Sequence, residues 1–221
     1  MTLNRIVILI AFFLVGSCGS EGDSESPPDL PLTSLPGVYS GVFPCEGCPG
    51  MPTTLWLRSD GRFFFEQTYP AVEERGAMHT HSLGRWGWDA DERIVVLQGS
   101  GPVRRFARPD ADTLMMQTNS DLAHRIVRDS AAPDFSATIR MLGMTRMRGG
   151  NAWFTECMTG FEVPVNKVGD FARLRHQYRS AAGQGRAVVV ELEGHFSWLR
   201  DGAPGSLTID RFITVKAEGG C

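Results

Sequence analysis

The sequence predicts a mainly β protein with two domains, an antiparallel β-barrel followed by an OB-fold barrel with one helix. Three features predict this class. Residues 36–130 are short runs of apolar and polar residues, often alternating, separated by Gly, Asp and Pro. The Ala-Ala-Pro of residues 131–133 marks a change of pattern. Beyond it, residues 170–182 have the periodicity of an amphipathic helix.

Short strands account for the first domain, which we expect over residues 36–130. Asp60-Gly61 favours a hairpin turn because glycine accommodates positive φ. Many short strands with regular turn signals are typical of an antiparallel barrel or sandwich. The expected strands are residues 37–43, 53–58, 62–69, 84–88, 93–98, 103–106, 113–117 and 124–128.

The second domain, expected over residues 136–221, has the element order of an OB fold. Asp170 is a plausible N-cap of its helix, and Gly183 would end it. Three strands, a helix and two further strands follow the OB order. The expected strands are residues 138–148, 152–156 and 161–165 before the helix, and residues 186–199 and 206–216 after it.

The formal net charge of −3 argues against a nucleic-acid partner. OB folds often bind nucleic acid, but neutralising phosphates requires a basic stripe, which this sequence lacks. The sequence also contains no Gly-x-Ser-x-Gly, no Gly-rich phosphate loop and no His-Glu-x-x-His. We therefore expect a protein that is not an enzyme.

The N-terminus has the pattern of an exported lipoprotein. Arg5 precedes an apolar run over residues 6–15, which is shorter than the roughly 20 residues of a membrane-spanning helix. Val-Gly-Ser-Cys at residues 15–18 resembles a bacterial lipobox. We expect residues 1–17 to be a signal peptide and Cys18 to carry the lipid anchor, with Gly19 favouring the outer membrane. Residues 18–35, rich in Ser, Glu and Pro, read as a flexible tether.

Four cysteines remain, and in an oxidising compartment two disulfides are their default fate. Local closure favours Cys45–Cys48, which leaves Cys157 to pair with Cys221. The second bridge closes a long loop and would stabilise the fold by about 4 kcal/mol. One interpretation is that this disulfide only stabilises the C-terminal domain. The other is that it serves as a sensor, because its loss would loosen the domain and expose surface.

Cys45-x-x-Cys48 leaves three alternatives open. The pair can form a structural disulfide, bind a soft metal such as Cu(I) or Zn, or exchange thiols with another protein. Exchange is the least favoured, because Pro49-Gly50 and a strand follow where a redox enzyme would begin a helix.

Further candidate metal ligands are Met51, His79 and His81. Met51 follows Cys48 closely, and the two histidines would share one face of a strand. A thioether and imidazoles suit copper. The alternative, which we favour, places both histidines in a solvated surface loop over residues 73–81. The Met141, Met144 and Met147 series is better explained by core packing.

The stretch PGVYSGVFPCEGCPG (residues 36–50), followed by Thr53-Thr54-Leu55 and Asp60-Gly61, resembles the N-terminal domain of the NlpE lipoproteins. FTECMTG (residues 154–160) resembles the C-terminal half found in some members. The resemblance implies a small lipocalin-like barrel joined to an OB-fold domain on an outer-membrane lipoprotein that faces the periplasm. It also implies reporting of surface contact, lipoprotein-trafficking, copper or redox stress to a two-component sensor kinase.

Two functions follow as expectations. The first is an envelope stress sensor whose C-terminal domain supplies a partner surface, with Cys157–Cys221 making its exposure depend on redox state. The second is a copper-binding lipoprotein that uses Cys45 and Cys48. The sequence requires no cofactor, copper remains open, and whether the protein forms a homodimer is undecided.

Overall fold

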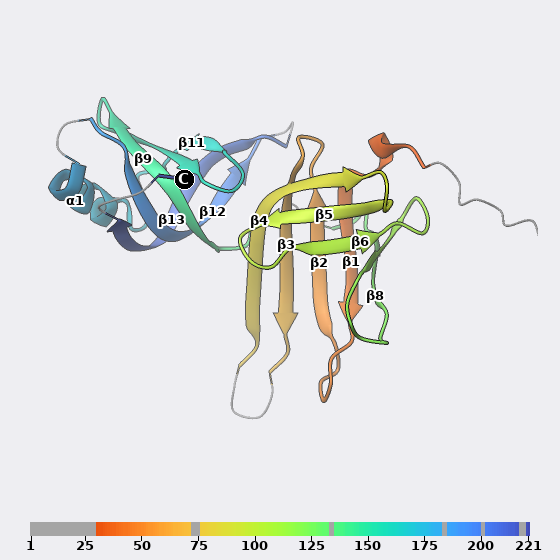
Figure 1. Ribbon diagram of the computed structural model, residues 1–221. Coiled ribbons are helices and arrows are strands. Elements are labelled where there is room, and N and C mark those ends of the chain that lie inside the picture. Colours follow the sequence, from red (N-terminus) through yellow and green to blue (C-terminus); the bar gives the residue numbers. More distant parts are fainter. Residues whose placement is uncertain (1–29, 72–75, 133–134, 183–184, 200–201, 217–219) are drawn as a thin grey trace, which may run out of the picture.

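The computed structural model describes residues 30–71, 76–132, 135–182, 185–199, 202–216 and 220–221. Two β domains lie side by side, with the N-terminal barrel next to a smaller sheet that carries the helix (Figure 1). The expected signal peptide and Cys18 fall outside the described residues. No helix within the described ranges is long and apolar enough to cross a membrane.

The N-terminal domain is a closed antiparallel barrel of eight strands, which confirms the predicted class. The barrel closes where Tyr39 and Ser40 of the first strand pair with Arg128 and Val127 of the last. The strands follow each other around the barrel in sequence order: β1 (Gly37–Phe43), β2 (Met51–Leu57), β3 (Arg62–Tyr69), β4 (Met78–Asp89), β5 (Ile94–Gly99), β6 (Arg104–Ala107), β7 (Thr113–Met116) and β8 (His124–Arg128).

Alternation along the strands sends every second side chain into the barrel, and β3 departs from this rule. Phe63 and Phe65 belong to the cluster that fills the interior, together with Leu55 on β2. Phe64 points outward between them, yet it is fully buried because it belongs to the core of the C-terminal domain. Three consecutive buried phenylalanines therefore mark the wall that the two domains share.

Strand β4 is longer than predicted, and the expected surface loop over residues 73–81 is wrong from Met78 onward. β4 pairs with the whole of β3, from Arg62↔Arg85 to Tyr69↔Met78. Residues 79–82 are polar on both faces of the strand, so the sequence there lacked the alternation that identifies a half-buried strand.

The end of the expected tether is folded. Residues 32–34 form a 3-10 turn (Leu32–Ser34), and Leu35 is fully buried in the barrel cluster. The Arg108 guanidinium donates hydrogen bonds to the Pro31 carbonyl (3.2 Å) and to Ser34 Oγ (2.6 Å). Leu35 therefore packs in the barrel core and is not part of a solvated linker.

The C-terminal domain has the predicted order of three strands, a helix and two strands. Its sheet runs β11-β10-β9-β12-β13, and a parallel bridge between Val165 and Leu207 brings β13 back toward β11. The elements are β9 (Ile139–Arg148), β10 (Asn151–Glu156), β11 (Glu162–Pro164), α1 (Phe171–Ala182), β12 (Val188–Trp198) and β13 (Pro204–Lys216).

Helix α1 packs on this sheet with the predicted face, since Phe171, Leu174 and Tyr178 are buried. Asp170 directly precedes it, as expected for an N-cap, but its carboxylate accepts a hydrogen bond from the backbone N–H of Phe212 in β13 (2.8 Å). The residue thus fastens the start of the helix to the sheet.

Candidate functional site

The two domains meet along the outer surface of β2, β3 and β4. Three barrel side chains, Trp56, Phe64 and Leu83, pack against apolar residues of the C-terminal domain. Those residues include Phe135, Phe161, Phe196 and Trp198. We call this set of contacts the domain interface.

Phe64 is the centre of the domain interface. Its ring stacks on Phe135 with centroids 4.8 Å apart and meets Trp198 edge-on at 5.2 Å. The ring centroids of Phe161 and Phe196 lie 6.2 and 6.3 Å from the centroid of Phe64. A buried aromatic in such geometry contributes through both its area and its ring contacts, so this side chain dominates the apolar part of the contact.

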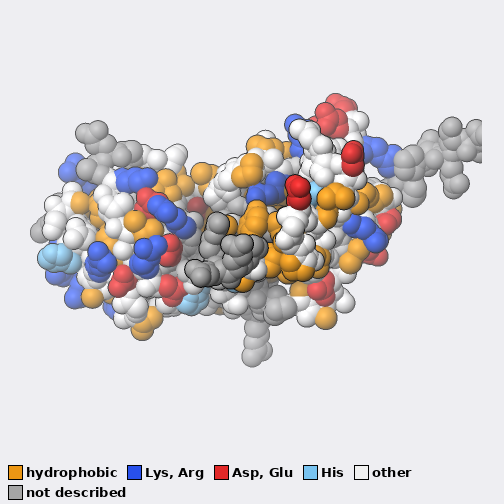
Figure 2. Space-filling view, turned by 90° about the horizontal axis from the view of Figure 1, so that it is seen from below, with side chains coloured by type: hydrophobic (Ala, Val, Ile, Leu, Met, Phe, Trp, Pro, Cys, Tyr) orange, Lys and Arg blue, Asp and Glu red, His pale blue; other side chains and the backbone are white. Residues whose placement is uncertain are grey.

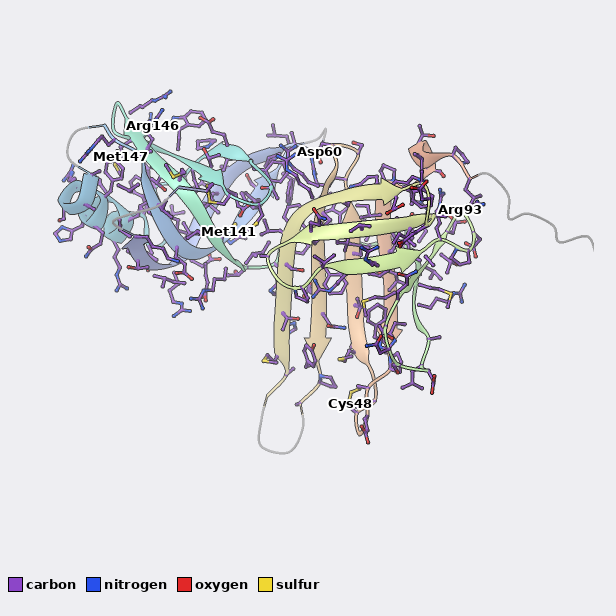
Figure 3. All side chains as sticks on the ribbon, viewed as in Figure 1. Cys48, Asp60, Arg93, Met141, Arg146 and Met147 are labelled. Carbon is purple, nitrogen blue, oxygen red and sulfur yellow. A yellow bond between two sulfur atoms is a disulfide. The ribbon has the colours of Figure 1, made fainter. Side chains whose placement is uncertain are left out.

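Arg58 borders the aromatic cluster. Its guanidinium lies 5.1 Å from the ring centre of Trp198 and forms an ion pair with Asp60 at 3.0 Å. Burial would raise the pKa of Asp60, but the bonds and charges of Arg58 and Arg62 outweigh it and lower that pKa. Figure 3 shows Asp60 at the end of the barrel beside the C-terminal domain.

The turn between β10 and β11 makes one polar part of the domain interface, and Arg58 makes another by donating to the Gly202 carbonyl (2.5 Å). The Thr159 carbonyl accepts hydrogen bonds from Arg62 Nε (2.6 Å) and from an Arg85 guanidinium nitrogen (3.2 Å). Arg62 also lies over the Phe161 ring, 4.5 Å from its centre. Two barrel strands thus hold one carbonyl of the C-terminal domain.

A buried carboxylate shapes this turn from inside. Glu156 is 1% exposed, and its Oε2 accepts hydrogen bonds from the Thr159 backbone N–H (2.6 Å) and hydroxyl (2.7 Å). Burial raises the pKa of the Glu156 carboxyl, and the bonds to Thr159 only partly oppose that. The carboxylate therefore orients the residue whose carbonyl the barrel binds.

The second disulfide lies in the same turn. Cys157 follows Glu156 directly and is bonded to Cys221, with Cα atoms 5.0 Å apart. The Cys157 backbone N–H donates to the Leu142 carbonyl on β9 (2.9 Å). The disulfide thus joins the last residue of the sequence to the turn that contacts the barrel.

The first disulfide lies far from this turn. Cys45 and Cys48 are bonded to each other in the loop between β1 and β2, at the end of the barrel opposite the domain interface. Figure 2 looks onto this end, where hydrophobic side chains gather. Val42 and Leu122 are more than half exposed there and line a cavity of about 430 Å³ beside the disulfide.

His79 and His81 lie on the outer face of β4, with parallel rings 6.4 Å apart. Glu66 on the neighbouring strand places its Oε1 3.4 Å from His81 Nε2 and 3.7 Å from His79 Nδ1. Met51, in contrast, packs against the cluster inside the barrel. The barrel wall therefore separates Met51 from the histidines.

The candidate metal ligands consequently form separate groups. Cys45 and Cys48 are together, whereas His79 and His81 belong to another strand. Among the described residues, no group of three or more His, Cys, Asp or Glu side chains has an arrangement that could hold a metal ion.

Sequence reasoning missed the residues of the domain interface. The signal for Phe64 was present, because three consecutive apolar residues break the alternation of a half-buried strand. No signal pointed to Arg62, Arg85 or Glu156. Arg62 and Thr159 are 97 positions apart in the sequence, and nothing in the residues next to either one marks it as part of a contact.

Comparison with known proteins bears on both domains. The family model of the NlpE N-terminal domain matches residues 39–123, and that of the NlpE C-terminal OB domain matches residues 135–221. Lipoprotein NlpE of Escherichia coli (strain K12) is 30% identical over 203 residues, which cover 86% of this chain and 81% of the relative. A crystal structure of the Cpx pathway activator NlpE from Escherichia coli is 24% identical and covers 85% of this chain and 98% of that chain, with a TM-score of 0.36.

The first prediction separates the domain interface from the barrel core. Phe64→Ala and Phe65→Ala remove neighbouring rings from opposite faces of β3, and each should cost about 3–5 kcal/mol. Only Phe64→Ala should uncouple the domains, so that calorimetry resolves two unfolding transitions. Wild type and Phe65→Ala should each give one. Identical profiles for the two variants would contradict the assigned role of Phe64.

The second prediction concerns pH. The folded protein holds the Glu156 proton more tightly than the unfolded chain, because burial raises this pKa above its ordinary value of 4.5. The stabilisation is complete below that value and is lost as pH rises through the raised pKa. Relative to Glu156→Gln, wild type should therefore lose thermal stability as pH rises above about 4.5.

The exposed Glu162→Gln on the same hairpin is the matched control. Its melting temperatures should follow the pH dependence of wild type. A constant difference between wild type and Glu156→Gln at every pH would contradict the prediction.

Proposed function

The chain belongs to the NlpE family, and on that premise we propose that it is an outer-membrane lipoprotein that senses envelope stress and reports it to a two-component system. The family is one of lipoproteins, and the Escherichia coli member is described as an activator of the Cpx pathway. In this proposal Cys18 carries the lipid, the protein faces the periplasm, and the partner is the periplasmic domain of a sensor kinase.

One observation supports the sensing role above all others. The Cys157–Cys221 disulfide belongs to the turn whose Thr159 carbonyl is held by Arg62 and Arg85. A disulfide that closes a loop of this length reduces the conformational entropy of the unfolded chain. It thereby stabilises the folded domain by about 4 kcal/mol. Reduction therefore removes stability from the element that docks the C-terminal domain on the barrel.

Loss of the disulfide would shift the population toward an open state. In that state Trp56, Phe64 and Leu83 lose their cover, and the C-terminal residues that pack on them become exposed as well. A partner that binds only the open state would then respond to the redox state of one cysteine pair. The polar contacts of Thr159 set how easily the interface opens.

The third prediction tests this role in cells. Cys157→Ser should raise the output of an envelope-stress reporter severalfold, because it favours the open state while the lipid anchor is unaffected. The matched control, Cys45→Ser with Cys48→Ser, removes the other disulfide and should leave the output at the wild-type level. Immunoblots of membrane fractions check that each variant is present in the envelope.

Two results would contradict the sensing role. One is unchanged reporter output from Cys157→Ser at a wild-type amount of protein. The other is an equal rise in output from the Cys45 and Cys48 double variant, which would indicate a general response to misfolded lipoprotein.

A second candidate function is copper capture by Cys45 and Cys48. Both cysteines are half-exposed on a loop beside an open cavity, and their disulfide can be reduced without disturbing either core. Two thiolates at this spacing suit Cu(I).

The fourth prediction tests copper capture directly. The reduced, purified protein should bind Cu(I) stoichiometrically, and Cys45→Ser with Cys48→Ser should abolish that binding. Cys157→Ser, which removes a thiol far from this loop, is the control and should leave the Cys45–Cys48 site intact. Absence of Cu(I) binding by the wild-type protein would end this candidate.

A further inference from the structure

The outer face of the C-terminal sheet carries a cavity that neither proposed function uses. Its volume is about 310 Å³, and it lies over β9, β10 and β11. Its lining includes Met144, Arg146, Arg148, Trp153, Glu162 and Cys221. We call it the Trp153 pocket. Figure 3 shows Arg146 near the end of β9 that lies farthest from the barrel.

Charge in the Trp153 pocket is only partly compensated. Arg146 and Arg148 are both exposed, and the guanidinium of neither forms an ion pair or hydrogen bond with another described residue. Glu162 is the single side-chain carboxylate among the lining residues.

Other basic residues of the same sheet are neutralised. Arg140 pairs with Glu191 at 2.6 Å, Arg211 pairs with Glu193, and Lys216 lies 3.5 Å from Glu191. The free guanidinium groups are thus a local property of the pocket. They contrast with a chain whose net charge is −3.

An exposed aromatic lies between these charges. Trp153 is 38% exposed and pairs across the strands with Arg146. Met144 adds an apolar wall two residue pairs further along on the same face, opposite Thr155. Tryptophan and arginine around a desolvated pocket are the side chains most enriched at the energetic centres of protein–protein contacts.

We propose that the Trp153 pocket binds an acidic segment of a partner protein. Carboxylates of the segment pair with Arg146 and Arg148, whose planar guanidinium groups match a carboxylate in two-point geometry. One apolar side chain of the segment enters the cavity beside Trp153 and Met144.

The shape of the Trp153 pocket favours a protein over a membrane surface. A membrane presents a plane of headgroups, which a concave site cannot follow. A protruding side chain flanked by acidic residues satisfies both the cavity and the charges. Because Cys221 forms part of the wall, the disulfide to Cys157 also helps to shape the site.

The fifth prediction uses a defined probe. A short fluorescent peptide in which Asp and Glu flank a central Leu should bind the purified full chain, and rising salt should weaken binding through screening. The combined Arg146→Gln and Arg148→Gln variant should bind at least about tenfold more weakly, as expected for residues at the centre of an interface. Trp153→Ala should weaken binding severalfold.

Three controls isolate the site. A peptide with Asn and Gln in place of the acids tests the charge, and Arg211→Gln removes a paired arginine of the same domain and should bind like wild type. Vesicles of phosphatidylglycerol test the membrane alternative. Melting temperatures check the fold of each variant. The two-arginine variant changes only exposed side chains, so it still tests the proposal if Trp153→Ala does not fold.

Equal binding by wild type and the two-arginine variant would overturn the proposal, as would no binding of the acidic peptide at all. Binding of vesicles but not peptide, lost in the two-arginine variant, would assign the site to anionic lipid and overturn it as well. Unchanged peptide binding by a folded Trp153→Ala would overturn the role of the cavity. None of these results depends on the stress reporter, so this proposal and the sensing role can fail separately.

Discussion

One carbonyl oxygen, that of Thr159, connects the main features of this structure. Arg62 and Arg85 of the barrel donate to it, while Glu156 holds the N–H and the hydroxyl of the same residue. A buried carboxylate is unfavourable unless its hydrogen bonds are satisfied. The geometry of the turn therefore depends on Thr159 being held from both sides, and the position of the C-terminal domain depends on the turn.

The apolar and polar halves of the domain interface have different roles. The rings around Phe64 supply area that is buried from water without a strong directional requirement. The hydrogen bonds of Arg58, Arg62 and Arg85 to carbonyls of the C-terminal domain fix which part of that domain meets the barrel. The disulfide at Cys157 lies next to the directional half. A change in this single covalent bond therefore acts on the contacts that orient the C-terminal domain, as the proposed sensing role requires.

Much of the fold could be predicted from the sequence, because alternation and turn residues are local signals. Asp60-Gly61 marked its hairpin, and the order of strands around residues 170–182 indicated the OB topology. The start of β4 was missed because residues 79–82 are polar on both faces of the strand, which leaves no alternation to detect. The domain interface was missed for a different reason: a contact between Arg62 and Thr159 joins distant positions, and a single sequence contains no record of it. The cysteine pattern predicted the Cys157–Cys221 disulfide in the C-terminal domain. It gave no sign that this disulfide lies next to the contact with the barrel.

The most direct test of this account is the effect of the Cys157–Cys221 bond on the overall dimensions of the protein. Small-angle X-ray scattering would be measured on a Cys45→Ser and Cys48→Ser protein, in which Cys157–Cys221 is the disulfide left to reduce. We expect the radius of gyration to increase on reduction, because the C-terminal domain separates from the barrel. An identical scattering profile for the oxidised and reduced protein would contradict the account.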